Sequence, residues 1–143
     1  MRALPLIIAL FCVGCNAPDL AASYRDPSSD LTVTIELRKA HPNLSEYYQT
    51  LVVSKGGADI IEKELSRTTG YTGANLYLCS AGVFMLDTYY ETEIIDTTKN
   101  KASSGNCHGT GAYIGIFDGA GSKHWKFTPA SQQSEKKLEM SGG

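Results

Sequence analysis

LTVTIELR, residues 31–38, alternates between apolar and polar side chains at every position. Successive side chains of a β-strand point to opposite faces of a sheet, so this stretch forms a strand with one apolar face and one face in water. The apolar face consists of Leu31, Val33, Ile35 and Leu37. A helix would scatter these four residues around its axis. We therefore predict a β-strand here and build the fold outward from it.

The segment that follows predicts a hairpin. Residues 47–54 are rich in β-branched and aromatic side chains, and Lys55-Gly56-Gly57-Ala58 has the composition of a tight turn. We expect residues 59–65 to be the returning strand, because a hairpin turn needs a partner for residues 47–54. The alternative is a short helix, since Asp59 and Glu62 have the spacing of a capping box.

Two further hairpins are predicted toward the C-terminus. Apolar runs flank residues 80–82 and residues 118–122, which are Gly-containing turns, and residues 91–97 continue or pair as another strand. Residues 66–75 and 99–111 are polar loops. The whole pattern gives seven or eight short strands and no long helical period. We predict an all-β fold, a single small antiparallel sandwich or barrel.

Composition limits the domain count and the classes of partner. The chain has 143 residues, 42% of them hydrophobic and 20% charged, which suits one folded domain rather than two. The formal net charge is −2, and the sequence contains no run or stripe of Lys and Arg. Binding to nucleic acid by phosphate neutralisation is therefore not expected.

The N-terminus has the features of an export signal. Met1-Arg2 precedes an apolar run of eleven residues, Ala3 to Val13. A helix of that length spans about 16 Å, at about 1.5 Å per residue. The hydrocarbon core of a bilayer is about 30 Å thick, so the run is too short for a stable membrane span. It has the length of the apolar region of a signal peptide, which we assign to residues 1–14.

The end of this run resembles a bacterial lipobox. Val13, Gly14 and Cys15 match that motif, with Cys12 at the position where Leu is usual. The resemblance implies that the leader is cut before Cys15 and that Cys15 carries the lipid. It thereby implies a bilayer as partner, and Asn16 favours the outer membrane by the sorting rule of enteric bacteria. The alternative is ordinary cleavage before Tyr24, which would release a soluble exported protein.

These features divide the chain into four parts. Residues 15–30 are the lipidated Cys15 and a flexible tether rich in Ala, Ser, Asp and Pro. Residues 31–129 are the β domain, and residues 130–143 are a polar C-terminal tail. The motifs identify no family for the β domain.

Four cysteines are present, and two of them belong to the N-terminal segment just described. The remaining pair, Cys79 and Cys107, is expected to form a disulfide in an oxidising compartment. Closing a loop of about 29 residues stabilises a domain by roughly 3.5 kcal/mol in the chain-entropy model.

Candidate chemistry is sparse. Cys107-His108, with Cys79, His124 or Met140, suggests a metal site, but the paired spacings of zinc motifs do not occur. A Gly-x-Ser-x-Gly motif is also missing from the sequence. We therefore expect a protein that is not an enzyme and has no metal and no cofactor.

Aromatic pairs are the most suggestive surface feature. Tyr47-Tyr48 and Tyr89-Tyr90 lie on expected strands, where one member of each pair points outward. With Trp125 they form a candidate binding surface for a protein or glycan partner. The alternative is that the exposed tyrosines only cover a half-hydrated sheet.

Three functional hypotheses follow. The first is a membrane-anchored envelope lipoprotein whose β domain has a non-catalytic binding or accessory role. The second is an inhibitor of a periplasmic or host hydrolase, because the chain is similar in size, anchor and cysteine use to the lysozyme inhibitors of Gram-negative bacteria. The third is a small enzyme or metal-binding protein. All three place the protein outside the cytoplasm.

Overall fold

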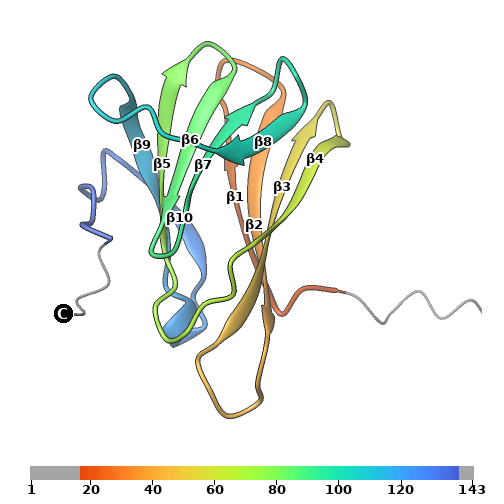
Figure 1. Cartoon of the computed structure of the whole chain (residues 1–143), viewed down its shortest axis with the longest axis vertical. Coiled ribbons are helices and arrows are strands. Elements are labelled where there is room, and N and C mark those ends of the chain that lie inside the picture. Colours follow the sequence, from red (N-terminus) through yellow and green to blue (C-terminus); the bar gives the residue numbers. More distant parts are fainter. Residues whose placement is uncertain (1–16, 139–143) are drawn as a thin grey trace, which may run out of the picture.

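The computed structural model describes residues 17–138 as two antiparallel sheets packed face to face, with ten strands in this range (Figure 1). Sheet A runs in chain order: β1 (Leu20–Arg25), β2 (Leu31–Lys39), β3 (Tyr47–Lys55) and β4 (Ala58–Leu65). Sheet B has the spatial order β10 (Lys126–Pro129), β9 (Ala112–Asp118), β5 (Ala74–Ser80), β6 (Val83–Thr88), β7 (Thr92–Asp96) and β8 (Lys101–Ser104). A short 3-10 helix, η1 (Ala120–Ser122), joins β9 to β10.

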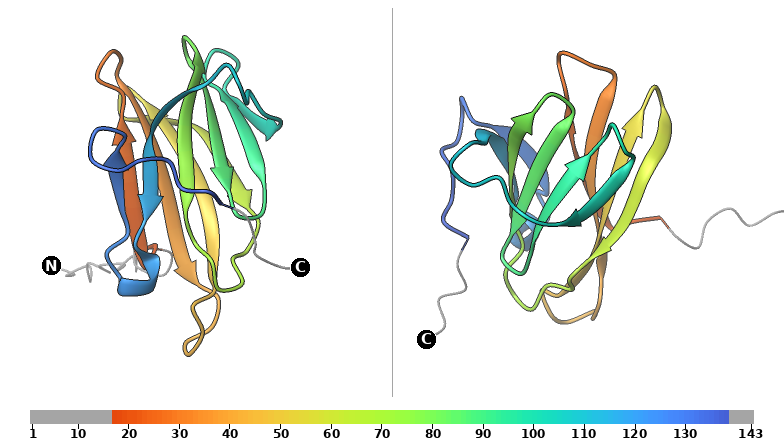
Figure 2. Two further views of the ribbon diagram at one scale, coloured as in Figure 1. Left: turned by 90° about the vertical axis from the view of Figure 1, so that its left-hand side faces the viewer. Right: turned by 45° about the horizontal axis from the view of Figure 1, so that its top comes forward.

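The predicted all-β antiparallel domain is confirmed, and its form is the sandwich rather than the closed barrel. Figure 2 shows the two sheets as separate layers. The structure has more strands than the seven or eight expected. The additional strands include β8, a four-residue edge strand inside the segment 99–111 that was predicted to be a loop.

The alternating stretch of β2 behaves as its pattern requires. Leu31, Val33, Ile35 and Leu37 are each at most 3% exposed and form the centre of sheet A's inner face. Full burial of such a side chain contributes about 1.5–3 kcal/mol, so this strand alone supplies a large part of the core. The same alternation continues on β3, where Leu51 and Val53 are fully buried.

The segment after the Gly-Gly turn is a strand, as expected, and not a helix. β4 pairs antiparallel with β3, and a register shift lies between Val53 and Ser54. Gly56 and Gly57 both have positive φ, which allows the tight connection. The pairing partner, rather than the local capping signal, decides the conformation of these residues.

The prediction of a flexible tether over residues 15–30 is wrong for the part that forms β1. This strand pairs with β2 along its length, from Leu20 opposite Leu37 to Arg25 opposite Thr32. Its alternation is weak in the sequence because the inward position at its centre is the small Ala22, which is 6% exposed. The β domain therefore begins at Leu20.

The C-terminal segment was predicted to be a polar tail over residues 130–143, and residues 130–138 instead cross the outer face of sheet B. The Asn75 amide donates to the Lys136 carbonyl at 2.7 Å. The Tyr77 hydroxyl donates to the Glu135 carboxylate, and the Lys136 ammonium pairs with Asp118. Burial and the Glu135 carboxylate raise the pKa of Tyr77. These contacts make the segment part of the fold.

The predicted signal peptide, residues 1–14, and the predicted lipidation site Cys15 lie outside the described residues. Among residues 17–138, no helix has both the length and the apolar character needed to cross a membrane.

Candidate binding cleft at the open end of the sandwich

The two ends of the sandwich are built differently. At the end where β1 begins, the space between the sheets is filled by Tyr47, by Ala120 of η1 and by Trp125. The Trp125 indole N–H donates to the Ile35 carbonyl at 3.0 Å, which ties the loop before β10 to sheet A. We call this the filled end. The opposite end, where the β1–β2 and β5–β6 turns lie, we call the open end.

A cleft of about 600 Å³ enters the molecule at the open end. The last inward-facing side chains of several strands lie at this end. Within the described residues no loop covers them, and this leaves the cleft. The lining side chains from the strands and their ends are Tyr24, Leu31, Lys55, Leu78, Phe84 and Thr97. This volume lies within the range of small-molecule sites, which are typically about 300–1,000 Å³.

The base of the cleft is apolar and rigidly packed. Leu31 is 3% exposed and Phe84 is 1% exposed, so both belong to the core. The Tyr24 ring meets Phe84 edge to face, with 6.3 Å between centroids. Leu78 forms one wall of the cleft and remains 39% exposed. An apolar group entering here would remove Leu78 from water without reorganising the core.

The β1–β2 turn forms one side of the rim, and its side chains hydrogen-bond to one another. The Asp26 carboxylate accepts hydrogen bonds from the Ser28 amide and hydroxyl and from the Ser29 hydroxyl. Although burial raises the pKa of Asp26, these hydrogen bonds outweigh it and hold the pKa below its usual range. The carboxylate is therefore ionised and already hydrogen-bonded by its own loop.

Lys55 provides the charge that remains available at the mouth. It continues the inward-facing series of β3, and among the described residues its ammonium has no ion-pair partner. Tyr24 also lines the cleft, and burial, and then the Asp26 charge, raise the pKa of its hydroxyl. The cleft thus combines an apolar base with the Lys55 cation at its edge, and its rim also carries the ionised, hydrogen-bonded Asp26 carboxylate. Its lining residues include no histidine, cysteine or glutamate.

Two of the residues predicted to form a binding surface are buried. Tyr47 is 4% exposed and Trp125 is 7% exposed, and both belong to the core of the filled end. The prediction is wrong for these two, because strand alternation places Tyr47 inward and the loop before β10 folds Trp125 between the sheets.

Tyr48 does point outward, from the outer face of sheet A. Its ring is 43% exposed, and the Arg67 guanidinium lies 5.9 Å from the ring centroid. A broad, shallow hollow of about 690 Å³ lies beside it, with the short Thr50 side chain among longer ones. The hollow is lined by Arg38, Tyr48, Thr50, Glu62 and Glu64.

Tyr89 and Tyr90 are half-buried and brace a loop. The Tyr90 hydroxyl accepts from the Thr69 amide at 2.8 Å and donates to the Tyr71 carbonyl at 3.1 Å. The Tyr89 ring packs against Tyr71 at 5.4 Å between centroids. Both residues lie between β6 and β7 of sheet B, whereas Tyr48 lies on the outer face of sheet A.

Comparisons with known proteins add no assignment. No family model, no curated protein and no solved structure matches this chain. The site must therefore be interpreted from its own chemistry.

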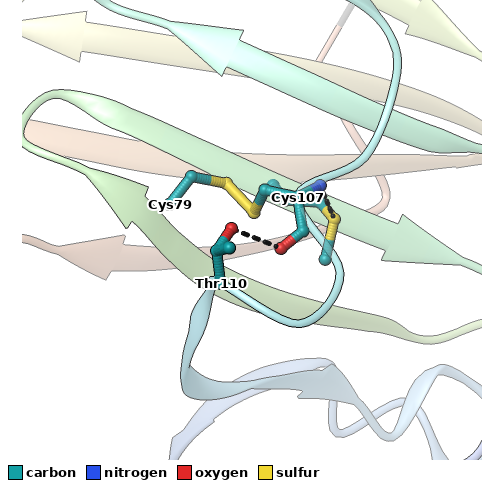
Figure 3. The surroundings of a disulfide bond; sticks show 4 residues. Cys79, Cys107 and Thr110 are labelled. Carbon is teal, nitrogen blue, oxygen red and sulfur yellow. Dashed lines mark hydrogen bonds between the residues drawn. A yellow bond between two sulfur atoms is a disulfide. The ribbon is translucent and has the colours of Figure 1, made fainter.

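The predicted disulfide is present. Cys79, the penultimate residue of β5, is bonded to Cys107 in the loop between β8 and β9, with 5.9 Å between Cα atoms (Figure 3). The Thr110 hydroxyl donates to the Cys107 carbonyl at 3.0 Å, and the Cys107 amide donates to the Met85 sulfur at 3.2 Å. Both thiols are consumed in the bond. Within residues 17–138 no three His, Cys, Asp or Glu side chains group as metal ligands do.

Sequence reasoning missed the cleft residues. Lys55 was assigned only to a turn, and Leu78 only to an apolar run. One signal was present, because Lys55 follows Leu51 and Val53 on the inward side of the same strand. A charged residue that continues an inward series marks the point where that strand leaves the core.

Proposed function

We propose that this protein is a lipid-anchored envelope protein with a non-catalytic binding domain, and that the open-end cleft binds an amphiphile with an anionic head. The observation that carries this proposal is the cleft itself, whose apolar base adjoins the Lys55 ammonium. Each CH₂ group of a ligand tail buried there contributes about 0.8 kcal/mol. The ammonium supplies a charge-assisted contact for a carboxylate or phosphate head.

The position of the cleft supports a binding role for an anchored protein. The described chain starts at the filled end, where Leu20 pairs with Leu37 near the end of β2. The cleft lies at the opposite end of the sandwich, between the β1–β2 and β5–β6 turns. If Cys15 carries the lipid, the mouth of the cleft faces away from the bilayer and remains accessible from the aqueous compartment.

A displacement assay with a fluorescent fatty acid tests the cleft. Leu78→Arg places a charged side chain in the wall of the cleft, and we expect it to weaken binding at least tenfold. Leu44→Arg is the matched control, since Leu44 is also an exposed leucine but lies in the β2–β3 loop at the filled end. The control should bind as the unchanged protein does. Equal binding by both variants would contradict the proposal.

The head group is tested separately. Lys55→Glu reverses the charge at the mouth, and we expect it to weaken binding of a fatty acid several-fold while leaving a fatty alcohol of equal length unaffected. A fatty acid and a fatty alcohol that bind equally to the unchanged protein would overturn the assignment of an anionic head. Intact mass spectrometry of protein from host membranes tests the anchor, which predicts a lipid-modified Cys15 as the first residue.

A second candidate function uses the outer face of sheet A. The exposed Tyr48 ring, with Arg38 and Arg67 as well as Glu62 and Glu64 around it, provides an aromatic contact within a surface of mixed charge, which suits a protein partner such as a hydrolase. Tyr48→Ala with Glu64→Lys should abolish capture of such a partner and leave fatty acid binding unchanged. Loss of both activities would show that the variant is misfolded, and capture at unchanged strength would contradict this candidate.

A further inference from the structure

We infer that the filled end of the sandwich is a membrane-docking surface that rests on the bilayer holding the protein's own anchor. This inference rests on the proposed lipid at Cys15. It goes beyond the anchor because it assigns an orientation and a contact surface to the folded domain.

The first argument is the length of chain between the predicted lipid and the fold. Asp19 is already fixed, because its amide donates to the Leu37 carbonyl at 2.9 Å and its carboxylate accepts from the Lys39 amide at 2.6 Å. Residues 15 and 19 are four positions apart in the sequence. At about 3.6 Å per residue, four residues span at most about 14 Å. A domain so closely attached cannot stand clear of the headgroups.

The second argument is what this end of the domain exposes. Leu44 is 50% exposed in the loop between β2 and β3, which projects at the lower end of the sandwich in Figure 1. Tyr71 is also 50% exposed, in the loop between β4 and β5 at the same end. Leucine side chains insert at the boundary between headgroups and acyl chains, and tyrosine favours the headgroup level, where one part of the ring is apolar and the hydroxyl is wet.

The third argument is that Tyr71 is held in its exposed position. The Tyr90 hydroxyl bonds to the Tyr71 carbonyl, and the Tyr89 ring packs against the Tyr71 ring. The loop that carries Tyr71 is therefore braced from the β6–β7 turn. If burial of apolar surface alone shaped this loop, the Tyr71 ring would be expected to point inward. The contacts with Tyr89 and Tyr90 instead hold the ring at the surface.

The charges at this end also fit an anionic bilayer. Three of its carboxylates have partners within the protein: Asp19 accepts from the Lys39 amide, Glu46 pairs with Arg67 at 3.4 Å, and Glu91 accepts from the Ser66 amide. The exposed Lys39 ammonium donates to the Pro42 carbonyl at 3.2 Å and has no ion-pair partner within residues 17–138. A lysine near an anionic surface adds about 1 kcal/mol of attraction, so the charge favours docking modestly and the apolar side chains set the orientation.

The test uses the lipidated protein purified from host membranes and reconstituted in nanodiscs of phosphatidylethanolamine and phosphatidylglycerol with a nitroxide-labelled headgroup. Amide NMR signals of residues 41, 43–45 and 69–72 should broaden strongly. Signals of residues 28–29, 56–57 and 81–82, at the open end, should remain sharp. A reversed pattern, or equal broadening at both ends, would overturn the inference.

Variants sharpen the result. Leu44→Asp combined with Tyr71→Asp should reduce the broadening of residues 41 and 43–45 at least twofold. Ala58→Asp, at an exposed position of the open end that does not line the cleft, should leave this broadening unchanged. Mass spectrometry of the same samples distinguishes failure of the proposed anchor from failure of the docking surface. An unmodified Cys15 would remove the anchor and the docking surface together. A lipidated Cys15 with unchanged broadening in the double variant would remove the docking surface alone.

Discussion

At the scale of single residues, neighbours in the sequence have opposite roles in this fold. Tyr47 packs in the core and Tyr48 lies on the outer face of sheet A, one position along the same strand. Strand geometry requires this separation, because consecutive side chains point to opposite faces. Trp125 follows no such rule, since it precedes β10, and its burial is decided by the loop that folds it against Phe117 at 6.2 Å between ring centroids.

Trp125→Ala is therefore expected to be a core deletion rather than a surface change. Removing a large buried aromatic side chain costs about 3–5 kcal/mol. The free energy of unfolding, measured by circular dichroism in urea, checks this value. Tyr48→Ala is the matched control and should change stability by less than about 0.5 kcal/mol. A Trp125→Ala variant as stable as this control would contradict the filled end described above.

At the scale of elements, pairing partners override local signals. β1 contains three alanine and serine residues and has little apolar contrast, yet it forms because β2 presents an edge to it. Residues 59–65 begin with a capping signal, yet they pair with β3 as β4. The loop between β8 and β9 has no comparable ladder over most of its length. Its covalent tie is the bond between Cys79 and Cys107.

Removing that bond should destabilise the domain through this loop. The two cysteines are 28 positions apart, and the chain-entropy model gives a loss of roughly 3.5 kcal/mol for such a loop. Urea unfolding of a Cys79→Ala/Cys107→Ala variant measures the loss. A reducing agent should lower the stability of the unchanged protein by a similar amount and leave the variant unaffected. A variant that responds to the reducing agent would refute the assignment of this bond.

At the scale of the whole molecule, the sheets are also joined by an ion pair. The Lys63 ammonium on β4 lies 2.6 Å from the Glu93 carboxylate on β7, and the Ser104 hydroxyl of β8 is 3.4 Å from the same carboxylate group. Glu93 is 1% exposed, whereas the Lys63 side chain is 31% exposed. The pair closes the side of the sandwich where β4 and β8 approach each other.

Replacing one partner of this ion pair should destabilise the domain more than replacing both. Lys63→Met leaves the buried Glu93 without its counter-charge, with an expected loss of about 3 kcal/mol, at the lower limit for buried pairs because Lys63 is partly in water. Lys63→Met with Glu93→Leu removes both charges and should recover most of the loss. A double-mutant cycle in urea measures the coupling. Additive effects of the two substitutions would show that the pair does not join the sheets energetically.

The residue pattern alone was enough to predict the class of the domain and its disulfide. The alternation in residues 31–38 fixed the inward face of β2, because a period of two has only one structural meaning. The pairing of Cys79 with Cys107 followed from the count of cysteines outside the N-terminal segment. The signal peptide and lipid at Cys15 stay predictions, since those residues lie outside the described part of the chain.

Which end of the sandwich is open depends on long-range contacts that the residue pattern does not show. Burial of Trp125 and exposure of Leu78 depend on whether a loop covers the last inward position of a strand, and that depends on contacts between residues far apart in the chain. The 90 positions between Trp125 and its hydrogen-bond partner Ile35 illustrate the distance involved. Local sequence patterns indicate which face of a sheet a side chain occupies. They do not indicate which loop or side chain packs against it.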